Sequence, residues 1–166
     1  MGTKTAAKSD QKPKIEDAAL VLRQFRVIFN AVRTHFRLLE KEIGLGGAQV
    51  WALSIISSQP GIGVGAVADA MDIHQTTASN LVKVLMKAKL IRATKSETDG
   101  RAVHLDALPA GMALLKKIQG PFEGVLPVAL RSLERGTLKR LHADLGDLIN
   151  VLNADQAAHG IPLADL

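Results

Sequence analysis

Residues 74–87, HQTTASNLVKVLMK, have the spacing of an amphipathic helix. Leu81, Val82 and Leu85 form an apolar stripe, with lysines one turn apart beside it. The first half carries hydroxyl, amide and imidazole side chains but no acid, although Asp or Glu would stabilise the positive end of a helix. Since the first N–H groups of a helix have no partner within it, this composition predicts a helix whose start is kept free for an external anion.

A second helix is expected directly before this one. Residues 63–71 place apolar side chains at core spacing, and Asp72-Ile73 forms a tight turn into the stretch that begins at residue 74. The small side chains of Ala66, Ala68 and Ala70 would let the two helices approach each other closely. Helix, tight turn and helix is typical of a helix-turn-helix, whose second helix enters the DNA major groove.

Two short strands are expected after the second helix. Residues 90–94 and 101–107 alternate apolar and polar side chains and flank a turn-rich loop. In the second strand, His104 and Asp106 would point away from the apolar side. A hairpin in this position is the wing of a winged helix, and its tip can reach the neighbouring minor groove. Between residues 74 and 101, six basic residues face two acidic ones, so this surface holds much of the net charge of +5.

These motifs resemble the multiple-antibiotic-resistance regulator (MarR) family of winged helix-turn-helix transcription factors. The resemblance covers nearly the whole chain from residue 15, and its most specific part is Asp99-Gly100-Arg101 in the wing. It implies a mainly α-helical homodimer with a small β-hairpin wing, two DNA-reading heads, and dimerisation arms from both termini. A ligand commonly binds between the arms and the head in this family. The other matching positions are Val67-Ala68-Asp69-Ala70-Met71, the stretch from Thr76 to Leu85, Leu90-Ile91, Leu105 and Gly111.

Three positions depart from the family pattern. Asp72 stands where the turn between the paired helices often has glycine, and Asp still tolerates a left-handed backbone. Lys89 replaces the glycine that usually follows the second helix, so it either adopts a strained cap conformation or extends the helix slightly. Leu108 replaces the usual threonine cap of the next helix, with Pro109 at the first helical position.

The start of the helix at 74–87 is where DNA contacts are expected. Hydroxyls and amides there are also ordinary cap residues, but DNA contact is favoured in a helix-turn-helix that is followed by a basic wing. His74 is equally plausible as a turn residue. The expected base readers are Gln75, Thr77 and Asn80, because amides and hydroxyls pair with base edges. The other expected contacts on this surface, mostly to phosphates, are Thr76, Ser79, Lys83, Lys87 and Lys95.

The resemblance also implies roles for the two charged residues of the wing motif. Arg101 would reach the minor groove or its phosphates, and Asp99 would hold the guanidinium in place. The alternative is a solvent-exposed turn pair that contributes little to folding.

Long apolar seams lie near both ends of the chain. From Ile15 to Ile43 the apolar side chains step by three and four residues. Packing of this helix against a second chain is favoured over the alternative, a core helix of a single chain with a solvated basic face. Gly120-Pro121 and Pro127 predict a bent or broken helix before a final leucine seam. The two seams are expected to pack together and then against the same pair in a second chain. The expected dimer contacts are Leu22, Phe25, Phe29, Leu141, Leu145, Leu148 and Leu152.

The chain divides into an expected series of regions. Residues 1–14 have the composition of a disordered basic tail. Residues 15–43 and 109–155 form the helical dimerisation region, and residues 46–107 form the winged helix-turn-helix. Residues 156–166 are expected to be a C-terminal tail.

Composition excludes several classes of function. The chain has no cysteine, so disulfides, thiolate metal sites and cysteine redox sensing are excluded. The five histidines are scattered without a short ligand spacing, so no metal site is expected. No phosphate loop or catalytic pair emerges, so we expect neither an enzyme nor a cofactor. Without a long apolar run the chain is expected to be cytoplasmic and to make no membrane contact.

A ligand pocket between the first helix, the tryptophan-containing helix and the head is an open question, because the same side chains would suit an ordinary core. A small aromatic or anionic effector would have Arg33 or His35 as its counter-group, by analogy with the family. The candidate pocket residues are Val32, His35, Phe36, Trp51 and Ile55.

The favoured function is a homodimeric, sequence-specific regulator of transcription. It would be a repressor that binds a palindromic double-stranded DNA operator and is released by a small molecule. The alternative is a winged helix that serves as an architectural or protein-interaction module without operator specificity.

Overall fold

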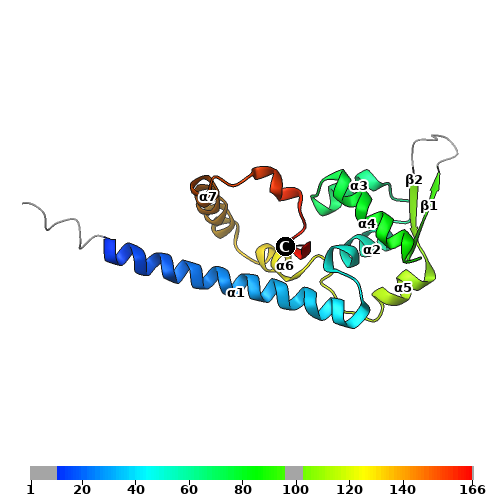
Figure 1. Ribbon diagram of the computed structural model, residues 1–166, viewed down its shortest axis with the longest axis horizontal. Helices are drawn as coiled ribbons and strands as arrows, with labels where there is room; N and C mark the ends of the chain where they lie inside the picture. The colour runs from blue at the N-terminus through cyan, green and yellow to red at the C-terminus, as the bar shows by residue number, and fades with distance from the viewer. Residues whose placement is uncertain (1–10, 96–102, 166) are drawn as a thin grey trace, which may run out of the picture.

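The computed structural model describes residues 11–95 and 103–165, and Figure 1 shows two parts. A reading head, residues 45–118, lies at one end of the long helix α1 (Gln11–Ile43). The rest of α1 extends away from the head. We call α1, α6 (Val125–Arg131) and α7 (Arg135–Leu152) the arms. The predicted fold, mainly helical with a two-stranded wing, is confirmed.

The core of the reading head is centred on α2 (Gly47–Ser58), which is apolar on nearly all sides. Leu53 and Ile56 of this helix are fully buried, and Leu85 and Leu105 reach them from elements further along the chain. Helix α5 (Pro109–Leu115) packs against α2 through Gly111, where an added Cβ would lie 2.4 Å from the Leu90 carbonyl oxygen. The head therefore has a closed core within one chain.

The helix-turn-helix consists of α3 (Val64–Met71) and α4 (Gln75–Lys87), which pack against each other. Asp72 ends α3 in the left-handed conformation, with φ 53° and ψ 47°. The N–H of Ile73 then donates to the Ala68 carbonyl at 3.0 Å, which closes the turn. An acid with a short side chain tolerates this backbone, as the sequence indicated.

Lys89 follows the end of α4, and its backbone decides between the two alternatives, a strained cap and a longer helix. Its φ is 56°, so it takes the left-handed conformation rather than extending the helix. The N–H of Lys89 donates to Met86 at 2.9 Å and that of Leu90 to Leu85 at 3.0 Å. This is the hydrogen-bond pattern of a Schellman motif, in which glycine is the residue without a steric cost.

The wing is formed by β1 (Ile91–Lys95) and β2 (Val103–Ala107), which pair antiparallel from Ile91↔Ala107 to Lys95↔Val103. Leu105 is fully buried, and on its other side β2 forms a bridge to Ile62. Both edges of β2 are therefore hydrogen-bonded, one to β1 and the other to Ile62, which attaches the stem of the wing to the head.

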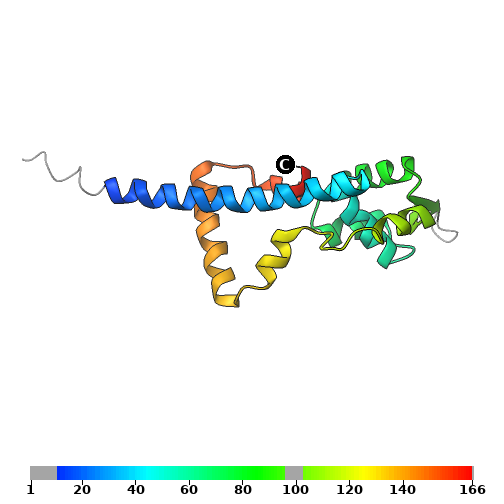
Figure 2. The ribbon, with the colours of Figure 1, turned by 90° about the horizontal axis from the view of Figure 1, so that it is seen from below.

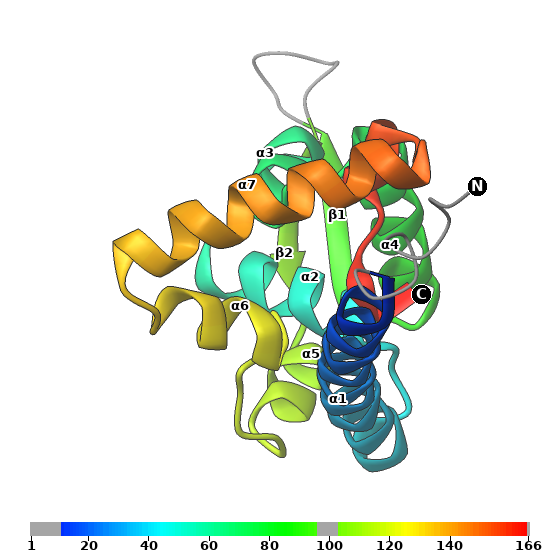
Figure 3. The same ribbon diagram turned by 90° about the vertical axis from the view of Figure 1, so that its left-hand side faces the viewer.

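The arms are broken where the sequence predicted an interruption. Helix α5 ends at Leu115 and the next helix begins only at Val125, after Gly124 with φ 103°. Pro127 lies in the first turn of α6, where a missing N–H costs no intrahelical hydrogen bond. The axis of α7 runs across that of α1 rather than along it (Figures 2 and 3), so the expectation that the two seams pack along each other within one chain is wrong.

Both expected tails need correction. Helix α1 begins at Gln11, so residues 11–14 of the expected disordered tail are helical; the backbone of Pro13 fits because it lies in the first turn. At the other end, residues 156–164 form a segment that we call the C-terminal strap. It contains η1 (Gln156–Gly160) and the first two residues of η2 (Leu163–Asp165). The strap returns to the head, where Gly160 and Pro162 are buried and η2 packs against α2.

Candidate nucleic-acid interface

Helix α4 separates its side chains cleanly between an inner and an outer face. The inner face is buried and anchors the helix on the head; it consists of Ala78, Leu81, Val82 and Leu85. The predicted DNA-contacting residues lie on the outer side, where Gln75, Thr76, Asn80, Lys83 and Lys87 are exposed and Thr77 and Ser79 are half-buried. The helix therefore exposes amides, hydroxyls and lysines, together with the apolar side chains of Val84 and Met86 towards its C-terminal end.

One of these side chains is already engaged. The Ser79 hydroxyl donates to the Gln75 carbonyl oxygen at 2.8 Å. In this rotamer the hydroxyl has lone pairs to offer but no free proton, so a phosphate contact through its O–H requires the side chain to rotate.

The start of α4 carries no acid in its first turn and no side-chain cap. Its N-cap residue is His74, whose N–H donates to the Gly160 carbonyl of the strap at 3.4 Å. The imidazole lies edge-on to that of His159, with ring centroids 5.6 Å apart. His74 is thus a turn residue in contact with the C-terminal strap, the second of the roles that the sequence left open.

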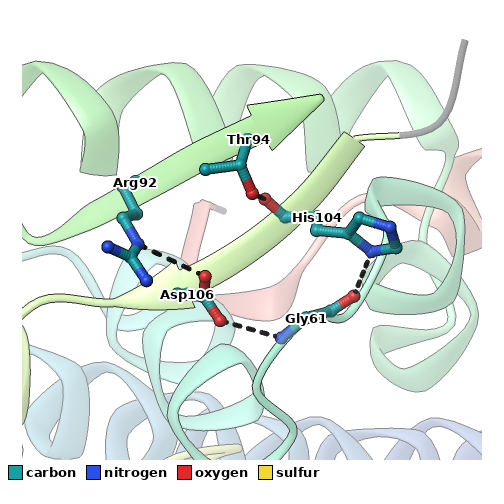
Figure 4. A network of polar contacts seen from close by, with 5 residues as sticks. All are labelled: Gly61, Arg92, Thr94, His104 and Asp106. Carbon is teal, nitrogen blue, oxygen red and sulfur yellow. Dashed lines mark hydrogen bonds and ion pairs between the residues drawn. The ribbon is translucent and has the colours of Figure 1, made fainter. Parts of the chain in front are cut away.

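A polar network fixes the stem of the wing, and sequence reasoning missed it (Figure 4). The Asp106 carboxylate accepts from the Gly61 N–H at 3.0 Å and from Arg92 Nε at 3.3 Å. His104 Nδ1 lies 2.9 Å from the Gly61 carbonyl oxygen, to which it donates. The available signal was the outward alternation of His104 and Asp106, but nothing in the sequence identified Gly61 as their common partner.

The tip of the wing bears the most specific motif of the sequence. Lys95 ends β1 with an exposed side chain. Asp99 and Arg101 lie outside the described residues. Their roles therefore stay predictions.

Comparisons with known proteins agree with this architecture. A model described as the MarR family matches residues 43–102. A Thauera aromatica protein, whose name associates it with transcriptional regulation of the hcr operon, is 29% identical over 119 residues, which cover 68% of this chain and 72% of that protein. Within residues 43–102 the chain is therefore similar to MarR-family proteins. Members of the MarR family are transcription regulators and not enzymes.

Solved structures with the same fold include two DNA complexes. The S. aureus MepR–DNA complex has a TM-score of 0.55 and 19% identity, covering 78% of this chain and 96% of that chain. Streptococcus pneumoniae FabT in complex with DNA has a TM-score of 0.51 and 15% identity, covering 82% of this chain and 97% of that chain. At these identities the likeness shows that the fold is shared.

A cavity of about 370 Å³ lies between the arms and the head. Of the five candidate pocket residues, Val32, Phe36 and Trp51 line it, whereas His35 and Ile55 do not. His35 Nε2 instead lies 3.1 Å from the Pro121 carbonyl oxygen, and Ile55 belongs to the core of the head. The sequence missed the residues that the strap and the helix-turn-helix contribute to the wall, which are Met71, Asp72, Ile73, His159, Ile161, Pro162, Leu163 and Ala164.

The rim of this cavity carries one ion pair, between Glu123 and Arg131. Arg131 Nη1 donates to Glu123 Oε2 at 2.9 Å, and Nη2 donates to Oε1. These hydrogen bonds lower the pKa of Glu123 from its ordinary value, against a smaller opposing effect of burial. Within the described residues, no group of three or more His, Asp or Glu side chains is arranged to hold a metal ion, and no helix is long and apolar enough to span a bilayer.

The arms expose the side chains predicted for the dimer interface. Phe29 is 59% exposed and stacks on the half-buried Phe25, with ring centroids 6.1 Å apart. Leu22, Leu145, Leu148 and Leu152 are exposed, while Leu141 is half-buried. Among the residues that the structure describes, these seams are therefore covered only in part by apolar side chains.

Proposed function

We propose that this chain is a MarR-family regulator, a homodimeric repressor that binds a palindromic double-stranded DNA operator through α4 and the wing. The observation that carries the proposal is the outer face of α4, where exposed amides, hydroxyls and lysines surround a helix start without acids. Gln75, Thr77 and Asn80 are placed to read base edges in the major groove, because amides and hydroxyls match their donor and acceptor patterns. Lys83 and Lys87 supply charge for phosphates and fix the register.

The unpartnered arms support the dimer. A helix of 33 residues, whose outer half exposes Leu22, Val27 and Phe29, is stable only if another surface covers it. A second copy offers the same seams in self-complementary form, as two-fold symmetry requires. Two heads related by that symmetry would read half-sites about one helical turn, roughly 34 Å, apart.

The cavity offers a physical route for release by an effector. Its wall joins α1 and α6 of the arms to Asp72 and Ile73, the turn directly before α4. A ligand that enlarged the cavity would therefore shift the arms relative to α4 and change the distance between the two heads of a dimer. The lining is mainly apolar with Arg131 at the rim, which suits a small aromatic acid.

The test is fluorescence anisotropy with the duplex upstream of the protein's own gene and with random duplex, across a salt series. A repressor should prefer its operator by roughly 10³ or more and lose affinity steeply as salt rises. Equal weak binding to every duplex tried, including selected random pools, would overturn operator recognition and favour an architectural role. Aromatic acids can then be screened in the same assay by release of the labelled duplex.

The dimer is tested separately by sedimentation. A mass of two chains at the concentrations used for DNA binding supports the proposal. A monomer that still binds the operator tightly would contradict it.

A further inference from the structure

We propose that His104 and Asp106 are positioning residues for DNA binding. They fix the stem of the wing to the turn at Gly61, so that the wing and α4 meet DNA in one fixed relative orientation. The inference rests on the proposed DNA-binding function and adds to it two residues that lie beside the contact surface.

The two side chains hold the two polar groups of one residue. They follow each other at alternate positions of β2 and point to the same side (Figure 4). Asp106 Oδ1 accepts the Gly61 N–H at 3.0 Å, and His104 Nδ1 donates to the Gly61 carbonyl oxygen at 2.9 Å. Between them, the Leu105 carbonyl oxygen also accepts the Gly61 N–H at 2.9 Å. The wing is thus attached to the turn before α3 by side chains as well as by backbone.

Gly61 suits this role because of its backbone. Its φ is +81°, a conformation that glycine adopts without steric cost, and an added Cβ would meet nothing within 4 Å. The requirement at this position is therefore the direction of its N–H and carbonyl groups, which meet β2, and not a lack of space.

The attachment lies beside the DNA-reading face. His104 and Gly61 share an open hollow with Gln75 and Ser79, which lie in the first two turns of α4. A change in the angle of the wing at this stem would therefore move the wing tip relative to the expected base readers. Because each protein–DNA contact requires close geometry, a freely hinged wing would have to be ordered on binding and would lose affinity.

The charge of Asp106 makes the proposal testable, because a purely electrostatic role and a positioning role predict opposite changes in DNA affinity when the carboxylate is removed. An acid near DNA repels phosphate, so on charge alone its removal should strengthen binding. Asp106 also accepts from Arg92 Nε at 3.3 Å, and the Arg92 side chain remains 63% exposed. A carboxylate in this position makes sense as a group that orients Gly61 and Arg92, and its removal should then weaken binding.

The experiment compares operator affinity and its salt dependence for Asp106→Ala, His104→Ala and His104→Asn. We expect Asp106→Ala and His104→Ala to weaken operator binding about tenfold and to flatten the salt dependence, since phosphate contacts of the wing are lost. His104→Asn should restore most of the affinity, because its amide nitrogen occupies the place of Nδ1 and donates to the same carbonyl. Thr94→Ala is the comparison variant on the same hairpin (Figure 4) and should change affinity less than twofold. It removes only a long hydrogen bond of 3.5 Å from Thr94 Oγ1 to the His104 carbonyl oxygen and leaves both Gly61 contacts in place.

A second measurement tests the orientation without DNA. The chain has no cysteine, so spin labels at Asp69→Cys on α3 and Lys95→Cys on β1 are specific. Double electron–electron resonance, with labelled protein diluted into unlabelled protein, should give one narrow distance distribution that Asp106→Ala broadens. Thermal melts establish that each variant is folded.

The outcomes separate this inference from the proposed function. If the wild-type protein shows no operator preference, the proposed function fails, and the spin-label distances still decide whether the stem is fixed. If the wild-type protein binds its operator and Asp106→Ala binds equally well or more tightly, the positioning role is wrong.

Discussion

The reading head and the arms carry apolar side chains at similar helical spacing but bury them very differently. In the head, Leu53, Ile56, Leu85 and Leu105 are fully enclosed by elements of one chain. In the arms, α7 has no buried residue at all, and Leu152 is 66% exposed. The apolar core of the head is thus closed within one chain. The arms instead expose apolar side chains that a second chain would have to cover.

The difference shows that the same pattern has two meanings. An amphipathic helix gains most of its stability from whatever covers its apolar face. In the head most of that cover comes from residues 45–118, and Leu39 of α1 completes it. In the arms it comes from elsewhere, so stability and DNA binding should depend on protein concentration through the arms and not through the core of the head.

Breaking the arms should have the largest effect. The double variant Phe29→Glu with Leu148→Glu places charges on both seams and should prevent dimerisation. Loss of the second head removes the gain from simultaneous binding of two half-sites, so operator affinity should fall about 10³-fold, or roughly 4 kcal/mol. Sedimentation and anisotropy measure the two effects. Glu42→Gln on the same helix is the control, and an unchanged dimer would refute the assignment of these seams.

Weakening the core of the head comes next. Leu53→Ala should lower the free energy of unfolding by about 3 kcal/mol, because it leaves a cavity that close-packed neighbours cannot fill. Urea denaturation measures this loss, which should leave the mass of the folded species unchanged. A dimer that dissociated in Leu53→Ala at concentrations where it remains folded would show that head and arms are not separable.

The contact between the strap and the head should be of intermediate strength. A Cβ at Gly160 would lie 2.5 Å from the His74 ring, so Gly160→Ala should cost up to about 2 kcal/mol or release the strap. Hydrogen exchange of residues 156–164 should become faster. Gly146→Ala in α7 is the matched control, because a Cβ there meets nothing within 4 Å. Equal exchange in both variants would mean that the strap does not depend on this contact.

A substitution at Lys89, which follows the end of α4, should stabilise the protein rather than destabilise it. Lys89→Gly should raise the free energy of unfolding by about 0.5–1 kcal/mol, since glycine removes the left-handed strain but adds entropy to the unfolded chain. Lys87→Gly, within the helix, should instead lower it by about 1 kcal/mol. Thermal denaturation of the two variants gives the comparison. Destabilisation by both would mean that the φ of 56° at Lys89 carries no strain.

The smallest effect should come from the ion pair at the rim of the cavity. The pKa of Glu123 is lowered in the folded protein, so the stabilisation is present above the unfolded pKa of about 4.3 and is lost as the pH falls through the folded value. Glu123→Gln should therefore be slightly less stable than the wild type at pH 7, and this difference should shrink as the pH falls below about 4.3. Urea midpoints across this pH range test this, and a constant difference would exclude the ion pair as its cause.

Local chemistry made part of the molecule predictable. The apolar spacing of residues 74–87, the short turn at Asp72 and the alternation in β2 each depend on neighbours in the sequence, and all three appear in the structure as expected. The interruption of the arms near Pro121 was predictable for the same reason.

Long-range partners were not predictable in this way. The pairing of Asp106 with Gly61 joins residues 45 positions apart, and that of His35 with Pro121 joins residues 86 apart. The C-terminal strap has too little periodicity to indicate a partner, and its contacts with His74 and α2 join it to segments far away in the sequence.

The sequence by itself determined the helix-turn-helix, the wing and the apolar seams, because helix and strand periods, turn residues and charge act over a few residues. Only the tertiary structure decided which side chains line the cavity, how the wing stem is held and where the strap lies. Those features depend on distances between segments that the chain brings together when it buries its core, and residue spacing carries no information on such distances.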